Sequence, residues 1–295
     1  MLTLEWLADL ADRNRSSLNA QVAEFLIQGQ RFSFNSQPGL MGVINLSPDS
    51  WYRESVVMSV EGAIERALLL KAQGADVVDL GAESTLAHAA RVNGSEQNAR
   101  LIPVLQALAG NGPILSVETY QPEVAQACLE AGAGVLNLTG SEDRDKIYPM
   151  VAAHDAALIL CYVQGKTVRT VGDFDFSHDP VGVMYEYFGA EIEKATQAGV
   201  SKIFVDPGLG FYYRNLNDSE ARVRHQMSVF LNTFRLRALG FPTCNALPHA
   251  FEYFQQEVRS AEPFFAVLAA LGKTDLFRTH EIPRTQAVLK TLGVF

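Results

Sequence analysis

The chain has 295 residues, of which 48% are hydrophobic and 19% charged, and its formal net charge is −9. This composition is typical of a globular protein large enough for one α/β barrel or two small domains. The acidic balance and the lack of a Lys/Arg run argue against nucleic acid as a main partner. The chain also lacks the roughly 18 consecutive apolar residues of a membrane span and the features of a secretory signal. We therefore expect a cytoplasmic protein that binds neither nucleic acid nor membranes.

Residues 1–38 differ in pattern from the rest of the chain. Their apolar residues recur at three- and four-residue spacing, which is typical of an amphipathic helix. These positions are Leu4, Leu7, Leu10, Leu18, Val22, Phe25 and Leu26. We interpret residues 1–38 as a helical extension that caps the following domain or joins a subunit interface.

From residue 39 onward, short apolar runs alternate with longer amphipathic segments. The runs cover residues 40–46, 75–81, 113–119, 134–139, 156–163, 202–208, 241–247 and 273–280. Most are continuously apolar, as expected of strands buried on both faces of a parallel sheet. The amphipathic segments 59–74 and 121–132 end at Gly74 and Gly132, which favours helices with glycine C-caps.

Eight strands alternating with helices predict an α/β fold, a (β/α)8 TIM barrel that forms one domain over residues 39–295. A doubly wound sheet is the structural alternative. In a TIM barrel, the chemistry lies at the C-terminal ends of the strands. The predicted site is therefore the rim formed by those ends.

Polar residues gather at the predicted strand ends, where an unpaired polar group would be costly to bury. They are Asn45, Asp79, Glu118, Thr119, Asn137, Tyr162, Gln164, Asp206, Asn245, Arg278 and His280. The amides and carboxylates suit a flat heterocycle with ring N–H and amino donors. The pair Arg278 and His280 suits an anion, because Arg supplies a planar donor fork and His a further donor.

The three cysteines, Cys128, Cys161 and Cys244, are far apart and form no CxxC pair. Their spacing argues against a zinc site and against a disulfide framework. Because free cysteine is among the most often buried residue types, we expect reduced, interior thiols.

Six segments in chain order carry a family resemblance. They are MGVINLSPDS (41–50), DVVDLGAEST (76–85), SVETYQPEVAQACLEAGAGVLNLTG (116–140), LCYVQG (160–165), VDPGLGF (205–211) and FRTHE (277–281). In this order they resemble the signatures of the dihydropteroate synthases, and the similarity spans about residues 40–295. That family joins 6-hydroxymethyl-dihydropterin pyrophosphate to p-aminobenzoate and releases pyrophosphate.

The resemblance implies a role for each matching position. The residues that would hold the reduced pterin are Asp79, Glu118, Asn137, Gln164, Asp206 and Phe211. Thr85, Arg278 and His280 would contact the anion, and Asn45 would lie beside Mg²⁺ and the pyrophosphate. Asn45, His249, Arg278 and His280 are the candidate catalytic residues, and a homodimer is the expected assembly.

The sequence also departs from the family pattern, mainly at the second-substrate site. Glu118 stands where the family has Asp, and Leu86 stands where it has Arg. In NALPHAF (245–251), the residues Leu247, Pro248 and His249 replace the family's Ser, Arg and Lys. Tyr212, Tyr213 and Arg214 replace a Gly-Lys pair.

Four interpretations follow from this uneven divergence. The first is a divergent transferase that passes a pterin to an aryl amine, in folate or related pterin biosynthesis. The second is a catalytically silent pterin-binding paralogue. The third is a relative of the methyltetrahydrofolate-dependent methyltransferases, which share the barrel. The fourth is a scaffold barrel assembled through its N-terminal helix.

Overall fold

The computed structural model describes residues 1–47, 55–57, 59–84, 91–166, 178–210 and 218–294. The strands are β1 Phe25–Ile27, β2 Gln30–Phe32, β3 Gly39–Asn45, β4 Val77–Gly81, β5 Ile114–Thr119, β6 Val135–Leu138, β7 Ala157–Cys161, β8 Ile203–Asp206, β9 Cys244–Ala246 and β10 Leu276–Thr279. The α-helices are α1 Leu4–Arg13, α2 Arg15–Leu18, α3 Val60–Ala72, α4 Gly94–Leu108, α5 Pro122–Glu130, α6 Arg144–Ala153, α7 Pro180–Gln197, α8 Ser219–Asn232, α9 Phe251–Phe254, α10 Ala261–Leu271 and α11 Ile282–Leu292. Two 3₁₀ segments in the described chain are η3 Thr233–Leu239 and η4 Gln255–Ser260.

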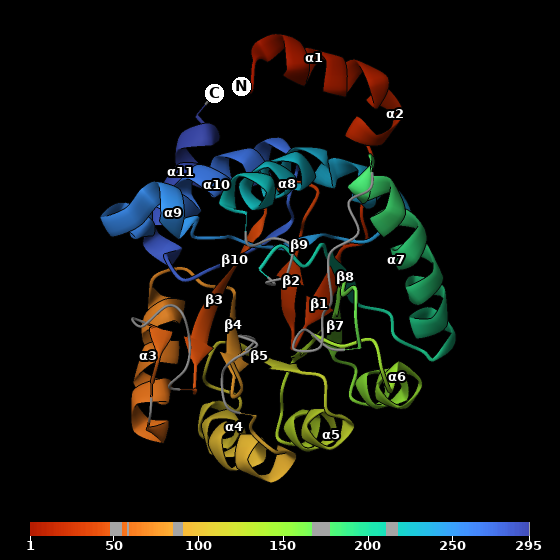
Figure 1. Ribbon diagram of the computed structural model, residues 1–295. Helices are drawn as coiled ribbons and strands as arrows, with labels where there is room; N and C mark the ends of the chain where they lie inside the picture. Colours follow the sequence, from red (N-terminus) through yellow and green to blue (C-terminus); the bar gives the residue numbers. More distant parts are fainter. Residues whose placement is uncertain (48–54, 58, 85–90, 167–177, 211–217, 295) are drawn as a thin grey trace.

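Strands β3 to β10 form a parallel barrel. Their order in the described sheet is β8-β7-β6-β5-β4-β3-β10-β9, with every neighbouring pair parallel. The ring closes between its two ends, because Val205 forms a parallel bridge to Thr243 and donates its N–H to Pro242 at 3.0 Å. Helices surround the strands on the outside (Figure 1). The predicted (β/α)8 barrel is confirmed, and each of its strands lies within the apolar run predicted for it or begins one residue before it.

The barrel strands are apolar on both faces, and the faces pack against different partners. On β4, Val78 and Leu80 point outward into the core shared with the helices, while Val77 points into the barrel. The same alternation directs Asp79, the next inward position, into the upper part of the barrel. The continuous apolar runs thus result from burial on both sides.

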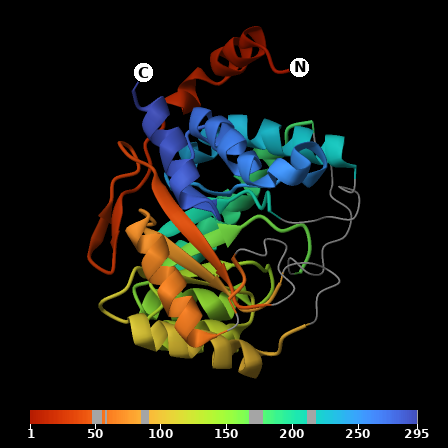
Figure 2. The same ribbon diagram turned by 90° about the vertical axis from the view of Figure 1, so that its left-hand side faces the viewer.

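The N-terminal extension combines helix with strand. Residues 4–18 are helical, as predicted, and Figures 1 and 2 show α1 beyond the C-terminal helices, away from the barrel strands. The prediction of helix at Phe25 and Leu26 is wrong, because these residues lie in a β1–β2 hairpin. Its turn uses Gln28 and Gly29, which have φ of 48° and 83°, and left-handed residues of this kind suit a tight hairpin.

The hairpin closes the N-terminal end of the barrel. Phe25 and Phe34 both contact Phe204 of β8, each with ring centroids 5.3 Å apart. Gln28 donates to the carbonyl of Gly132, just before β6, at 2.9 Å. These contacts fill the bottom of the barrel, so the polar groups above them are accessible only from the C-terminal rim.

Glycine C-caps end two helices at the predicted places. Gly74 and Gly132 follow α3 and α5 with φ of 103° and 101°, values that favour glycine. All three cysteines are free and buried, as predicted. In the described residues, no helix is long and apolar enough to cross a membrane.

Candidate functional site

A buried hydrogen-bond network lies at the C-terminal end of the barrel, with Asp79 at its centre. Ser116 on β5 donates to Asp79 Oδ1 at 2.7 Å. Asn137 on β6 and Arg278 on β10 donate to Asp79 Oδ2 at 3.0 and 2.8 Å. The carboxylate is fully buried, so these donors replace the water that its charge would otherwise need.

Arg278 links Asp79 to Glu118. Its Nη2 donates to Glu118 Oε2 at 2.8 Å, while its Nε is bonded to Asp79. Burial alone would lower the pKa of Arg278, but the charges of Asp79 and Glu118 raise it above its ordinary value. The exposed side-chain fractions of Arg278 and Glu118 are 17% and 11%, against 0% for Asp79, so the network opens to solvent through these two residues.

Two carboxyl groups of the rim hold protons more tightly than usual. Burial raises the pKa of Glu118 to about 7, against the opposing charge of Arg278. Burial also raises the pKa of Asp206 on β8 to about 6, although Gly208 donates its N–H to Asp206 Oδ1 at 2.7 Å. The rim therefore combines hydrogen-bond acceptors with carboxyl groups that are partly protonated near neutral pH, which suits a neutral or cationic ring system.

Gly81 lies between the side chains of Asn45 and Glu118. A Cβ added to Gly81 would lie 3.6 Å from Asn45 Oδ1 and 3.8 Å from Glu118 Oε2. Asn45 Nδ2 donates to Ser55 Oγ at 2.6 Å, which fixes the orientation of the amide. Its oxygen is a ligand type that Mg²⁺ accepts, so Asn45 fits one position of a magnesium–phosphate site.

Two histidines at the rim share one buried carboxylate. His249 lies after β9 and His280 after β10, and their rings are 5.1 Å apart. His280 Nδ1 lies 2.8 Å and His249 Nε2 3.1 Å from the same oxygen, Oε1 of Glu262 on α10. Although burial opposes ionisation, the two imidazoles lower the pKa of Glu262 well below its usual range. This cluster borders Arg278, which lies two residues before His280 in the chain.

The structure brings together most of the predicted site residues in the described chain. Asp79, Glu118, Asn137 and Arg278 form one network. Asp206 lies close enough for its charge to add to those of Asp79 and Glu118, which raise the pKa of Arg278. Thr85 and Phe211 lie outside the described residues, as do Leu86, Tyr212, Tyr213 and Arg214.

Other strand-end residues face away from the network. Asn245 points outward, where its Nδ2 donates to Thr274 Oγ1 at 2.6 Å, because Cys244 takes the inward position on β9. Gln164 donates to the hydroxyl of Tyr162 at 2.9 Å. Leu247 is buried in the core between strands and helices.

Sequence reasoning missed Ser116 and Glu262. Ser116 lies two residues before Glu118 on the same strand, so alternation along β5 was an available signal. Glu262 lies in the first turn of α10, where an acidic residue is ordinary, so no sequence pattern indicated its contact with two histidines.

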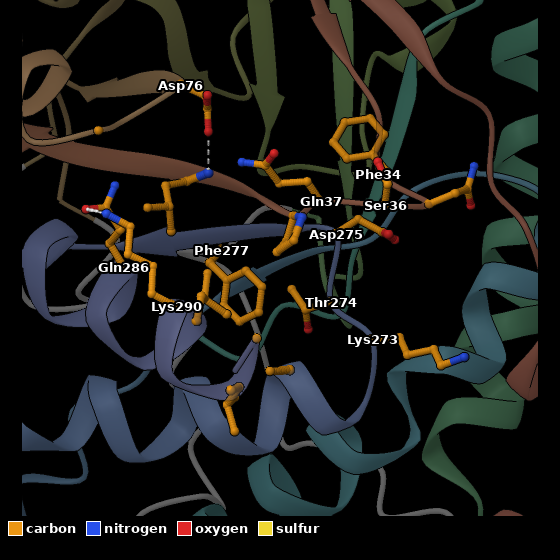
Figure 3. Close-up of a pocket in the computed structure, with 18 of the residues that line it drawn as sticks. Phe34, Ser36, Gln37, Asp76, Lys273, Thr274, Asp275, Phe277, Gln286 and Lys290 are labelled. Carbon is orange, nitrogen blue, oxygen red and sulfur yellow. Dashed lines mark hydrogen bonds between the residues drawn. The ribbon is translucent and has the colours of Figure 1, made fainter. Parts of the chain in front are cut away.

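A cavity of about 650 Å³ lies at the opposite end of the barrel from this network. Figure 3 shows Asp76 and Asp275 at its wall, and these residues precede β4 and β10. Residues at the N-terminal end of a TIM barrel usually serve stability, and the chemistry of the fold lies at the other end. We therefore place the candidate site at the rim.

The chain resembles known proteins over nearly its whole length. A dihydropteroate synthase of Synechocystis sp. is 32% identical over 274 residues, covering 88% of this chain and 90% of that protein. One from Streptococcus pyogenes is 28% identical and covers 92% and 98%. The solved dihydropteroate synthase of Xanthomonas albilineans with 4-aminobenzoic acid superposes with a TM-score of 0.76 at 26% identity, covering 93% and 98%.

The family model described as "Pterin binding enzyme" matches residues 41–240, from β3 to the end of η3. This segment contains Asp79, Glu118, Asn137 and Asp206. The strand residues from β4, β5, β6 and β8 thus lie within the matched part, whereas Arg278, His249, Glu262 and His280 lie beyond it. The chain belongs to the family of pterin-binding enzymes.

Proposed function

We propose that the rim binds a reduced pterin and that the protein is a dihydropteroate synthase-like transferase of folate biosynthesis. The observation that carries this proposal is the Asp79–Asn137–Arg278–Glu118 network. It offers carboxylate and amide groups at the solvent-accessible end of the barrel. The proposal draws support from relatives named dihydropteroate synthase that match the chain over most of its length.

In this proposal the pterin ring lies over Gly81, where no side chain fills the space beside Glu118. Amino and ring N–H groups of the pterin donate to Asp79 and Asp206, and Asn137 orients Asp79 while it binds the ring edge. Glu118, with its raised pKa, contributes a carboxyl group that donates or accepts a proton near neutral pH. The apolar floor of the barrel excludes water from below.

The proposed reaction replaces pyrophosphate by an aryl amine at the pterin methylene. The amine nitrogen forms the new C–N bond as the C–O bond to pyrophosphate breaks, and the amine then loses a proton. Arg278 and His280 stabilise the departing anion by charge and hydrogen bonding. Mg²⁺, held in part by the Asn45 oxygen, would neutralise phosphate charge. A homodimer and a cytoplasmic location belong to the same proposal.

Isothermal titration with 6-hydroxymethyl-dihydropterin pyrophosphate and Mg²⁺ tests the proposal. We expect saturable binding that Asp79→Asn weakens by about 100-fold, because the substitution removes the central buried charge (a loss of ~3 kcal/mol). The control His154→Gln changes an exposed histidine at the end of α6 and leaves binding unchanged. Absence of binding by the wild-type chain would sink the proposal.

A second candidate is a pterin-binding paralogue without turnover. It is favoured by Leu247 and His249 at the positions where the family has Ser and Lys. Release of pyrophosphate in the presence of p-aminobenzoate distinguishes the two. The transferase releases it and restores growth of a strain that lacks the synthase, whereas the silent paralogue binds the pterin and does neither.

A further inference from the structure

The His249–Glu262–His280 cluster has the donor set of a metal site. Two imidazole nitrogens and one carboxylate oxygen come from the ends of β9 and β10 and from the first turn of α10. The three donor atoms all lie within 4.8 Å of one another. Segments far apart in the chain therefore supply three ligand atoms to one point at the rim.

The spacing of the donor atoms fits a single small ion. Donors about 2.0–2.2 Å from one ion lie roughly 3.0–3.5 Å from each other. Glu262 Oε1 is 2.8 Å from His280 Nδ1 and 3.1 Å from His249 Nε2. The two histidine nitrogens lie within 4.8 Å of each other, so the rings would turn toward a common centre to bring all three donors to coordination distance.

Groups behind the cluster hold Glu262 in place. The hydroxyl of Thr279 donates to Glu262 Oε2, and the backbone N–H groups of His280 and Glu281 donate to the same oxygen at 3.0 and 3.2 Å. Oε1 is thereby directed at the two rings. Carboxylates that ligate metals are typically hydrogen-bonded in this way, which fixes the orientation of the ligand oxygen.

The cluster is largely buried. The side chains of His249 and His280 are 10% and 14% exposed, and that of Glu262 is 0% exposed. An ion held by the three would keep a coordination position toward the rim, beside Arg278. Three protein ligands and an open position are the arrangement of catalytic rather than structural zinc sites.

We propose that His249, Glu262 and His280 bind one divalent transition-metal ion, preferably Zn²⁺, with an open position directed to the substrate rim. Two nitrogen ligands and one oxygen ligand suit Zn²⁺ and Co²⁺ better than Mg²⁺, which takes oxygen ligands. The ion supplies the positive charge that a lysine supplies at the position of His249 in the resembled family. The lack of a CxxC pair does not bear on this cluster, because its ligands are histidine and glutamate.

The competing explanation is a hydrogen-bonded His–Glu–His arrangement with no affinity for metal. Metal-free protein titrated with Co²⁺ distinguishes the two, because bound Co²⁺ gives visible d–d absorption bands. Competition with Zn²⁺ should abolish these bands. No pterin is present in this titration, so its outcome is independent of the proposed function.

We expect one Co²⁺ per chain in the wild-type protein. His249→Gln and Glu262→Gln each weaken binding by more than about 100-fold, since each removes a ligand. Thr279→Val, which keeps the shape and removes the hydroxyl behind Glu262, weakens it by about 10–100-fold. His154→Gln, a histidine outside the cluster, binds as the wild type does.

Circular dichroism confirms that each variant is folded before titration. If Glu262→Gln does not fold, His249→Gln decides the question, because His249 lies at the edge of the cluster. Wild-type protein without Co²⁺ bands overturns the proposal. A His249→Gln variant that binds Co²⁺ as tightly as His154→Gln overturns it equally.

Discussion

The two sides of the rim are built in different ways. On one side, here called the strand-borne side, β4, β5, β6 and β8 supply Asp79, Glu118, Asn137 and Asp206 directly from strand positions. On the other side, His249 and His280 follow the ends of β9 and β10, and a helix supplies Glu262. Arg278 lies between the two sides.

The difference shows which parts of a barrel site can change independently. Strand positions are fixed by barrel register, as in the direct pairing of Glu118 with Asn137, so a ring-binding set on strands is preserved with the fold. Positions after the strands depend on loops and on the packing of α10. Substitutions there can therefore alter one side of the rim while the strand-borne side keeps its contacts.

The largest expected effect comes from removing the cation that pairs with both Asp79 and Glu118. Arg278→Met leaves Asp79 and Glu118 buried without their cation, so we expect the free energy of unfolding to fall by about 3–5 kcal/mol at pH 7. The loss should be smaller at pH 5, where Glu118 is protonated. Urea unfolding at both pH values measures it.

Arg15→Met is the matched control for this substitution. Arg15 forms an exposed pair with Asp12, and such pairs contribute about 0–1 kcal/mol. An Arg278→Met variant no less stable than Arg15→Met would show that the two sides of the rim do not depend on Arg278.

The next effect is a pH dependence of the free energy of unfolding, caused by Glu118 on the strand-borne side. The pKa of Glu118 is raised from 4.5 to about 7 in the folded protein, so between these values the unfolded chain binds fewer protons. The free energy of unfolding should therefore fall as pH rises from 5 to 7, by about 2–3 kcal/mol for this group. Urea unfolding in pH steps measures this slope.

Glu118→Gln isolates the contribution of that carboxyl. Asp206, with a pKa of about 6, loses its proton in the same direction but at lower pH. The slope between pH 6 and 7 should consequently flatten in Glu118→Gln, while Asp206→Asn retains it. An unchanged slope in Glu118→Gln would assign the pH dependence to other groups.

The smallest predicted effect is a difference in ring affinity between a variant of the strand-borne side and a variant of the other side. With 6-hydroxymethyl-pterin, which lacks the pyrophosphate, Asn137→Ala should weaken binding by about 10–100-fold through the loss of one buried polar contact, ~1.4–2.7 kcal/mol. His249→Gln should change it by less than about threefold. Isothermal titration of both variants tests this, and equal losses would mean that the ring contacts both sides.

Sequence patterns sufficed for the barrel because its strands are buried on both faces. The inward polar residues Asp79 and Asn137 interrupt those runs at strand ends, which made the strand-borne side predictable. Asn245 interrupts its run in the same way yet points outward, since its direction depends on alternation from Cys244. The hairpin at residues 25–32 was predicted as helix because apolar spacing outweighed the turn signal of Gln28 and Gly29.

The second side required tertiary structure. Glu262 is separated from His249 by 13 residues and from His280 by 18, and no local pattern relates them. Their contact depends on how α10 packs between the ends of β9 and β10. Only the three-dimensional fold brings these donors to one point.

The position of Arg278 has a consequence for ligand selection. Its guanidinium is planar and donates to Asp79 and Glu118, the acceptors that a pterin ring would use. On the proposed function, Arg278 therefore competes with the ring for these acceptors, and binding would exchange one flat donor array for another. A heterocycle with fewer donors would leave the acceptors bound to Arg278, so the proposal implies selection against weakly complementary rings.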